Sequence, residues 1–381
     1  MRNISSLRII SAVIFGVLIL PATVSHIPSV LSSSTAVAAT AEEHWERQWK
    51  KILNDAKKEK EVVMYGTPSS SIRMALSKAV KEKYGLEMQF VTGKGVALHK
   101  KVLSERGAGL YIPDVYMGGT SSVIAMLLPK EVMDPLRPEL ILPEVLDTKN
   151  WYGSKLPFIE NKEYLFGFRG SVYHSYTINT KMVKPEEITS YSDLLKPKFK
   201  GKIAMGDPTA GGAASSFVTF VGEYAMGYDF IRELAKQEPF MSRDERLLVE
   251  WVARGKYQIL IGTRPGPLTE FKKAGAPLLS IIAREGSFIE PGSGTIGLYN
   301  RRPRPNAARV FLNWLLTKEG QSVYAKAAGI ESARVDVPND HLPSNLVRQP
   351  GKKYIYANEQ FHKLAEKNWE LSKEVFGPLL K

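Results

Sequence analysis

Apolar positions along the chain follow two patterns in turn, short continuous runs and longer stretches with apolar residues three and four positions apart. Glu61–Gly66 (EVVMYG) is a run typical of a buried strand, and Ser70–Tyr84 has the helical spacing and stops before Gly85, a residue type that ends many helices. The alternation continues with strands at Leu86–Val91 and Asp114–Met117 and with helices at Val96–Glu105 and up to Met126. Strands that alternate with helices favour parallel βαβ units, an α/β sheet with helices on both faces.

The middle and the end of the chain repeat this alternation. Strands are predicted at Ile203–Met205, Tyr257–Ile261 and Thr295–Tyr299, and helices at Ala213–Ala225, Leu268–Ala274, Ala307–Leu316, Glu319–Ala328 and Asn358–Val375. A chain of 381 residues is longer than a single hydrophobic core usually serves, which favours two lobes. The order of elements fits one lobe inserted into another. Residues 40–170 and 285–381, with a helical C-terminal tail, are expected to form a discontinuous first lobe, and residues 171–284 the second.

Residues 1–39 are predicted to be a signal peptide and not part of the fold. Positive charge precedes Ile9–Leu20, an apolar run that is short for a membrane span, which needs about 20 residues. Ala36-Val37-Ala38-Ala39 offers the small-residue pattern of a cleavage site, with cleavage expected after Ala39. Retention as an N-terminal anchor is the alternative, because Ser25–Thr35 is long for a cleavage region. The amphipathic helix at Trp45–Lys58 then begins the fold.

The charge balance is basic, but its distribution argues against nucleic acid. Lys and Arg number 52 and Asp and Glu 39, a formal net charge of +13. Basic residues are interspersed with acidic ones, as in Lys57–Glu61, and the densest basic stretch, Arg301–Arg304, has no interleaved aromatic residues for base stacking. The chain has no cysteine, which excludes disulfides, thiolate metal sites, a cysteine nucleophile and a lipoprotein anchor on cysteine.

Four strand-to-helix loops share the same polar composition. Each follows a predicted strand and is rich in glycine and hydroxyl side chains: Thr67–Ser71, Gly118–Ser122, Gly206–Ala213 and Gly262–Gly266. Free backbone N–H groups and the positive end of the helix dipole favour anions at such places, and ligands of open α/β sheets bind beside the carboxyl ends of the strands. Helix capping explains any single loop, but two loops from each predicted lobe indicate a polar site between the lobes.

Motifs of catalysis and of resident cofactors are missing from the sequence. The match to G-x-G-x-x-G at Gly292–Gly297 precedes a predicted strand and not a helix, so it does not indicate a dinucleotide site. The chain has no P-loop, H-E-x-x-H or G-x-S-x-G motif, and its six histidines are not paired at metal-ligand spacing. We therefore expect a protein that is not an enzyme and that has no cofactor and no resident metal.

Several segments resemble one family and together span nearly all of the expected mature chain. They are Val62–Gly66, Ile112–Tyr116, Gly206–Gly212, Gly294–Leu298 and Ala307–Gln321, of which the last is the most specific. On these segments the chain resembles the periplasmic solute-binding proteins of ABC importers, in the two-lobed type-2 class and most similar to the ferric-iron group. The resemblance implies two α/β lobes joined by two crossing strands, here near Phe168–Tyr176 and Ile281–Thr295, which close on a ligand and dock on a membrane permease.

The resemblance also locates candidate ligand-binding residues, and there the chain departs from the iron-binding pattern. Iron-binding relatives carry adjacent tyrosines where this chain has Gly262–Pro265, and often an acid where it has Gly118-Gly119. Arg264 stands in the loop without tyrosines, and Arg169 just before the first crossing, where a salt bridge is its alternative role. A guanidinium group matches a carboxylate or a phosphate. The predicted ligand-binding residues are Thr67, Ser69, Ser70, Gly119, Thr120, Arg169, Thr209, Gly211, Gly212, Thr263 and Arg264.

The sequence thus predicts a monomeric, periplasmic binding component of an ABC importer. Its expected ligand is a small anionic solute with a phosphate, phosphonate or carboxylate group, which it delivers to a permease in the inner membrane, and no nucleic acid is expected as a partner. Three alternatives remain open. They are a ferric-iron carrier that holds the metal through a bound anion, an exported hydrolase or lyase on the same scaffold, and a sensor that presents its bound state to a receptor.

Overall fold

The computed structural model describes residues 32–93, 95–210, 212–292, 294–344 and 347–380. The apolar run Ile9–Leu20 lies outside these residues, as does Gly211. Helix α1 (Ser32–Glu59) begins earlier than the expected Trp45 and includes the expected cleavage residues Ala36–Ala39. The chain divides into two units, Met1–His44 and Trp45–Lys381, and the second contains the sheets. Among the described residues, no helix combines the length and the apolar character needed to cross a membrane.

The first sheet is mixed and has the strand order β2–β1–β3–β12–β4, with β5 also paired to β12. Its strands are β1 (Glu61–Gly66), β2 (Glu87–Thr92), β3 (Val115–Gly118), β4 (Met133–Asp134), β5 (Phe166–Gly167) and β12 (Thr295–Tyr299). Strand β1 pairs in parallel with β2 and β3, as the βαβ pattern predicts, whereas β12 returns antiparallel to β3. Val62 and Met64 of β1 lie in one buried cluster and Val63 and Tyr65 in another, so both faces of the strand are covered.

The helices of this part of the chain confirm most of the predicted helical segments. They are α2 (Ser70–Tyr84), α3 (Gly95–Gly107), α4 (Thr120–Met126), α5 (Pro143–Leu146), α10 (Pro305–Leu316) and α11 (Lys318–Ala328). Helix α2 has the bounds that its spacing predicts, because Ser69 caps its start and Gly85, with φ of +70°, ends it in the left-handed conformation. The one-turn helix α5 was not predicted, since four residues are too few to show a helical period.

The second sheet has the order β10–β6–β9–β7–β8. Its strands are β6 (Tyr176–Asn179), β7 (Ile203–Gly206), β8 (Phe240–Ser242), β9 (Ile259–Ile261) and β10 (Leu278–Ile281), and the helices beside it are α6 (Gly212–Phe220), α7 (Tyr228–Ala235), α8 (Glu245–Ala253) and α9 (Pro265–Lys273). Strand β7 pairs in parallel with both β8 and β9, while β6 runs antiparallel to its neighbours. Helix α6 ends at Phe220 and continues as a π-helical turn, Val221–Ala225.

The two segments expected to cross between the lobes run antiparallel to each other. The backbone N–H of Phe168 donates to the carbonyl of Gly294 at 2.9 Å, and that of Tyr173 to the carbonyl of Phe288 at 2.9 Å. A third segment, which was not predicted, lies beside them. Its strand β13 (Tyr354–Tyr356) pairs in parallel with β11 (Ser287–Ile289), and the hydroxyl of Tyr356 donates to the carbonyl of Gly167 at 2.6 Å. Strands of three residues are too short to show a period in the sequence.

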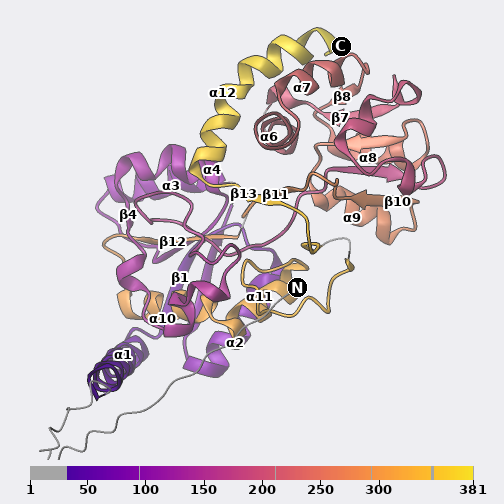
Figure 1. Ribbon diagram of the computed structural model, residues 1–381. Coiled ribbons are helices and arrows are strands. Elements are labelled where there is room, and N and C mark those ends of the chain that lie inside the picture. The colour runs from indigo at the N-terminus through magenta and orange to yellow at the C-terminus, as the bar shows by residue number, and fades with distance from the viewer. Residues whose placement is uncertain (1–31, 94, 211, 293, 345–346, 381) are drawn as a thin grey trace, which may run out of the picture. The chain divides into compact units, whose positions relative to one another are not determined.

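The C-terminal helix α12 (Glu359–Phe376) lies with the second sheet, which corrects the predicted placement of this tail in the first lobe. Phe361 and Phe376, both 0% exposed, share a buried cluster with Tyr176 of β6 and Phe217 of α6. Figure 1 shows α12, in yellow, beside α6 and α7. The amphipathic pattern of a helix predicts that one face is buried, but it does not identify the element that covers this face.

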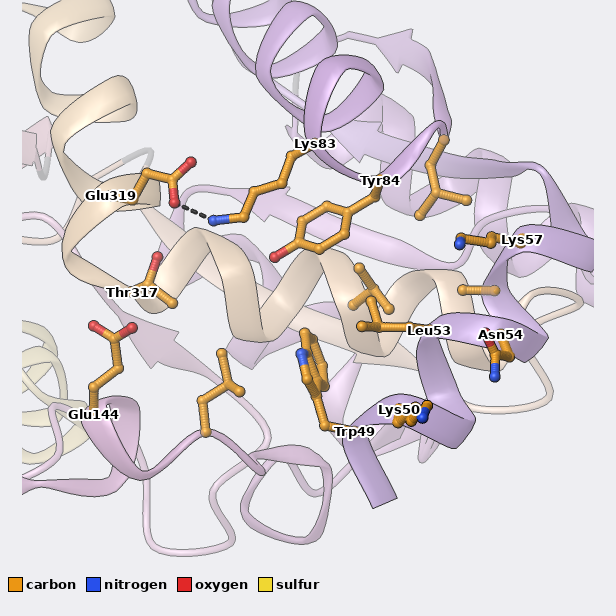
Figure 2. A pocket seen from close by; sticks show the side chains of 14 residues that line it. Trp49, Lys50, Leu53, Asn54, Lys57, Lys83, Tyr84, Glu144, Thr317 and Glu319 are labelled. Atoms are coloured by element: carbon orange, nitrogen blue, oxygen red, sulfur yellow. Dashed lines mark hydrogen bonds and ion pairs between the residues drawn. The ribbon is translucent and has the colours of Figure 1, made fainter. Parts of the chain in front are cut away.

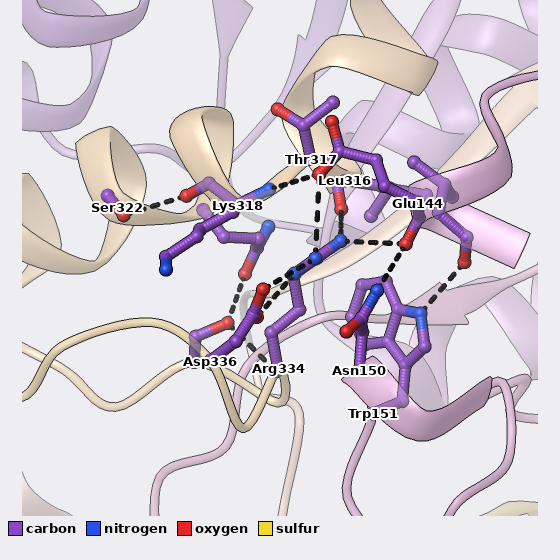
Figure 3. Close-up of polar contacts among 12 residues, drawn as sticks. Glu144, Asn150, Trp151, Leu316, Thr317, Lys318, Ser322, Arg334 and Asp336 are labelled. Atoms are coloured by element: carbon purple, nitrogen blue, oxygen red, sulfur yellow. Dashed lines mark hydrogen bonds and ion pairs between the residues drawn. The ribbon is translucent and has the colours of Figure 1, made fainter. Parts of the chain in front are cut away.

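The segment that follows α11 is held to the first sheet's helices by Arg334, whose side chain is 1% exposed (Figure 3). Its guanidinium donates to both carboxylate oxygens of Asp336, at 2.8 and 2.9 Å, and to the carbonyl of Leu316 at the end of α10, at 3.0 Å. It also lies over the ring of Trp151, at 5.4 Å from the ring centre. The arginine thereby satisfies a helix-end carbonyl that would otherwise be buried without a partner.

Candidate functional site

Three parallel strands of the second sheet, β9, β7 and β8, are neighbours and end at the same edge. Strand β7 leads into Asp207, β8 into Arg243, and β9 into the loop of Arg264. A cavity of about 270 Å³ lies among these loops and the start of α6. Its lining includes Asp207, Gly212, Ser242, Arg243, Glu245 and Arg264. This is the edge at which open α/β sheets bind ligands.

Glycine at two positions lets these loops approach one another. Gly262 has φ of +66°, in the left-handed region, and a Cβ atom on it would lie 2.7 Å from the Cα atom of Ala214 in α6. A Cβ atom on Gly206 would collide with the carbonyl of Gly262. A larger residue at either position would push the loop after β9 away from α6 and distort the cavity.

Arg243 and Asp207 form an ion pair at the edge of this cavity. The Nε atom of Arg243 donates to Oδ2 of Asp207 at 2.8 Å, and the side chains are 74% and 2% exposed. The other carboxylate oxygen accepts hydrogen bonds from the backbone N–H and the hydroxyl of Thr209, at 2.8 and 2.6 Å. Burial alone would raise the pKa of Asp207, but the bonds from Thr209 and Arg243 lower it below its usual value. Asp207 is therefore ionised at neutral pH and holds Arg243 at the cavity.

Arg264 has a carboxylate partner of its own. Its Nε atom lies 3.1 Å from both carboxylate oxygens of Glu245, the first residue of α8, and its backbone N–H donates to the same carboxylate at 3.1 Å. The side chain of Arg264 is 70% exposed and that of Glu245 17%. Exposed ion pairs contribute about 0–1 kcal/mol to stability, so this pair can be exchanged for a ligand at little cost.

The loops of the first sheet use their polar groups within the fold. The hydroxyl of Thr120 is buried and lies 2.8 Å from that of Thr295, and the carbonyl of Gly119 accepts a hydrogen bond from Tyr116 at 2.7 Å. Ser69 caps α2 by accepting from the backbone N–H of Ile72 at 3.4 Å. The side chains of Thr67, Ser69 and Ser70 are exposed. These three are the most exposed residues in this part of the predicted site, and a solute can reach them.

Arg169 lies in a charged cluster of the crossing segments. Its Nε atom donates to the hydroxyl of Ser171 at 2.8 Å. Burial raises the pKa of the Glu290 carboxyl, and the charge of Arg169 and a hydrogen bond with Tyr173 offset part of this effect. Burial also raises the pKa of Tyr173, and the charge of Glu290 adds to the shift. The charge of Glu245 raises the pKa of Tyr173 further, and the charge of Arg264 lowers it.

The structure thus brings together part of the predicted site. Gly212 and Arg264 line the cavity, and Thr209 and Thr263 belong to the same loops. The other predicted residues that the structure describes do not line it: Thr67, Ser69, Ser70, Gly119, Thr120 and Arg169. Gly211 is not among the described residues. Sequence reasoning missed Arg243 and Glu245, although Ser242-Arg243-Asp244 before a helix is another polar strand-to-helix loop of the kind that we sought.

A second cavity, of about 450 Å³, lies in the first lobe between α1, α2, α10 and α11 (Figure 2). Trp49, Leu53 and Tyr84 line its apolar part, and Lys83 contacts Glu319 across its rim. Tyr84 and Leu86 directly precede β2, so this cavity lies at the amino ends of the strands, away from the edge that carries the predicted site. Among the residues with described positions, no group of three or more His, Asp or Glu could hold a metal ion.

Two mixed sheets with polar loops at their strand ends make up most of the fold, and a family model identifies the class of protein. Residues 61–329 match the family model described as bacterial extracellular solute-binding protein, and the chain belongs to this family. The chain is also 27% identical over 276 residues to an uncharacterised protein of Haemophilus influenzae, a match that covers 69% of this chain and 74% of that protein.

Solved structures share the fold over most of the chain. A Trichodesmium protein, IdiA or FutA, in complex with iron and citrate has 18% identity and a TM-score of 0.61, covering 84% of this chain and 99% of that chain. AfuA of Actinobacillus pleuropneumoniae with fructose 6-phosphate has 19% identity and a TM-score of 0.57, covering 82% and 98%. These likenesses confirm the predicted type-2 periplasmic binding protein fold. The chain is a solute-binding protein of the ABC-importer type, as its resemblance implied.

Proposed function

We propose that the protein captures a small anionic organic solute, with a phosphate, phosphonate or carboxylate group, and delivers it to an ABC permease. The observation that carries this proposal is the pair of arginines, Arg243 and Arg264, on the wall of one cavity at the start of α6. Guanidinium groups and the free N–H groups of a helix start both favour an anion. The planar guanidinium group of arginine, unlike the ammonium group of lysine, can bond both oxygens of a carboxylate or phosphate group.

The size of the cavity supports closure of a second set of loops over the solute. Complete ligand sites usually enclose about 300–1,000 Å³, and this cavity has about 270 Å³. We infer that the exposed hydroxyls of Thr67, Ser69 and Ser70 in the first lobe complete the site when the lobes close. Arg169 and Tyr173 in the crossing segments would then lie at its base.

The carboxylates beside the arginines favour an organic anion over a simple inorganic one. Glu245 and Asp207 leave the ligand-free site nearly neutral, because each already pairs with an arginine. When the anionic group of a solute replaces Glu245 as the partner of the Arg264 guanidinium, the oxygens of Glu245 can accept hydrogen bonds from hydroxyl groups on the same solute. Fructose 6-phosphate, the ligand in the AfuA structure, combines these two kinds of group.

Ferric iron held through an anion is the second candidate, and the iron and citrate in the Trichodesmium structure favour it. The chemistry of Tyr173 in the crossing segments argues against its direct ligation of iron. Tyrosine binds ferric iron as the tyrosinate, and burial raises the pKa of Tyr173 well above its usual value. Citrate carries carboxylates that Arg243 and Arg264 could bind, so iron would arrive as a ferric citrate complex.

We further propose that the protein acts in the periplasm, as a monomer and without catalysis. Support comes from the A-x-A pattern at Ala36–Ala39 and from the family, whose members are extracellular binding proteins. Intact mass of the exported protein tests the first point. A chain that begins near Thr40 supports it, and a chain that retains Ile9–Leu20 contradicts it in favour of an anchored form.

Calorimetric titration of the purified protein with inorganic phosphate, fructose 6-phosphate, citrate and ferric citrate tests the proposed ligand class. We expect the phosphorylated or carboxylated organic anions to bind, and Arg264→Ala to weaken binding by roughly 10- to 150-fold, since a charge-assisted hydrogen bond contributes about 1.5–3 kcal/mol. Arg264→Lys should recover part of the loss, because it keeps the charge and loses the fork.

Arg254→Ala is the matched control. Arg254 is also exposed and also pairs with a glutamate, Glu250 at 2.8 Å, but it lies at the far end of α8. We expect it to leave affinity unchanged. If Arg264→Ala keeps full affinity and lowers the melting temperature instead, Arg264 is a structural tie and the anion site is wrong. Binding of ferric citrate without binding of citrate or fructose 6-phosphate would favour the iron carrier.

A further inference from the structure

The C-terminal helix α12 reaches the loop that precedes α6. It packs against α6 and against the short helix Pro208–Ala210 in that loop. Trp369 of α12 is 45% exposed, yet its indole N–H donates to the backbone carbonyl of Thr209. The neighbouring Asn368 is buried and its amide lies 3.4 Å from the hydroxyl of Thr219 in α6. Helix α12 therefore contacts both the loop and the helix that form one wall of the candidate site.

Thr209 connects this contact to the arginine of the site. Its carbonyl accepts from Trp369, while its backbone N–H and hydroxyl both donate to one carboxylate oxygen of Asp207, at 2.8 and 2.6 Å. The other oxygen of Asp207 holds Nε of Arg243 at 2.8 Å. A continuous series of hydrogen bonds thus runs from the exposed indole of Trp369 to the guanidinium that lines the cavity.

We propose that Trp369 is a positioning residue for the solute site: its indole N–H fixes the Thr209 peptide, and through Asp207 it fixes the direction of Arg243. This inference rests on the proposed function and extends it to a residue well separated from the predicted site in sequence. A guanidinium held in one orientation loses less conformational freedom when it binds an anion, so a fixed Arg243 binds more tightly.

The exposure of Trp369 distinguishes this role from simple packing. With 45% of its surface open to solvent, the ring buries less area than a core residue, and Lys373 lies over it at 4.8 Å from the ring centre. The buried face of α12 is formed by other residues, such as Phe361 and Phe376. Loss of the indole N–H should therefore disturb the loop more than it disturbs the stability of the whole protein.

The first arm of the test needs no ligand. In Trp369→Phe, which keeps an aromatic ring and removes the donor, amide hydrogen exchange of residues 207–210 should become several-fold faster, with the melting temperature almost unchanged. Trp49→Phe is the matched control, because Trp49 is a half-buried tryptophan on α1 that lines the other cavity. It should leave exchange in this loop as in the wild type. Unchanged exchange in Trp369→Phe overturns the proposal.

The second arm is a double-mutant cycle with fructose 6-phosphate as the probe. Trp369→Phe should weaken binding by about 3- to 10-fold, the effect of one hydrogen bond. In an Arg243→Ala background the same change should cost less than about twofold, because Trp369 acts through Arg243. Additive effects, or unchanged affinity in the single variant, overturn the proposal. If wild-type protein binds none of the anions tested, the proposed function fails, and the exchange arm still decides whether Trp369 holds the loop.

Discussion

Arg334 is a charged residue whose contacts join separate parts of the fold. It is almost fully buried, and its partners come from three places in the chain: Asp336, the end of α10 and the ring of Trp151. Arg334→Ala would leave a carboxylate and a helix-end carbonyl without their partner, so we expect a loss of about 3–5 kcal/mol in the free energy of unfolding. Urea denaturation followed by circular dichroism measures it, and a loss below about 1 kcal/mol would contradict the structure.

The ion pair between Arg334 and Asp336 also makes the stability of the protein depend on pH. Burial tends to raise the pKa of Asp336, but the hydrogen bonds and charge of Arg334 lower it below its usual value. The ionised carboxylate therefore stabilises the folded protein above about pH 3.9, the pKa of an aspartate in the unfolded chain. This stabilisation is lost as the pH falls through the lower pKa of the folded state. Asp336→Asn should therefore reduce stability at neutral pH and make little difference near pH 2. Arg334→Lys, which cannot reach both oxygens, should fall between the wild type and Arg334→Ala.

The candidate site was predictable residue by residue only in part. The position of Arg264 at the strand edge could be predicted because its loop follows a recognisable strand, and the residue lines the cavity there. Its partner Glu245 could not, since the two meet only through the pairing of β7 with both β8 and β9. Arg243 was missed for a different reason, because the three residues of β8 are too few to show a strand period.

At the scale of elements, α12 offers the sharpest test. Phe361 is 0% exposed and lies 5.5 Å, ring centre to ring centre, from Phe288 of β11. Phe361→Ala should cost about 3–5 kcal/mol, the usual range for a buried phenylalanine. Hydrogen exchange should speed up in β6 and β7 of the second sheet and much less in β1 of the first. The exposed Lys367→Ala on the same helix is the control, and equal acceleration in both sheets would show that α12 does not belong to the second core.

The elements themselves follow from the sequence where they are long and periodic. Helices α2, α10 and α11 were predicted to within about two residues, because their apolar spacing and caps are local features. The partner of α12 was not predicted, and neither was the third crossing segment. Both depend on how the apolar faces of different elements pair in the folded molecule, and no single stretch of sequence contains this information.

On the scale of the whole molecule, three histidines contribute to the response to acid. Burial lowers the pKa of His99 to about 4, that of His174 to about 3 and that of His362 to about 4. Their unfolded value is about 6.5, so each stays neutral in the fold and takes up a proton on unfolding between pH 6.5 and 4. The contribution of these neutral histidines to the free energy of unfolding is therefore fully present above about pH 6.5, and it is lost as the pH falls from 6.5 to 4.

His99→Gln isolates one of these groups. His99 is fully buried, with Nε2 3.0 Å from the hydroxyl of Ser122, a contact that glutamine can imitate. We expect the slope of unfolding free energy against pH to fall by close to one proton between pH 6 and 4.5, measured by urea denaturation at several pH values. An unchanged slope in His99→Gln would show that His99 is charged in the folded protein.

The position of α12 in the second core also has a consequence for the folding and export of the chain. The core of the second sheet includes Ala357, Phe361 and Phe376, close to the last residue. That sheet cannot complete its core until residues up to Phe376 are available, and until then the apolar residues that α12 covers stay exposed. For a chain exported as we propose, late completion keeps the polypeptide loose enough to pass a translocation channel, and folding to the stable form then begins on the far side of the membrane.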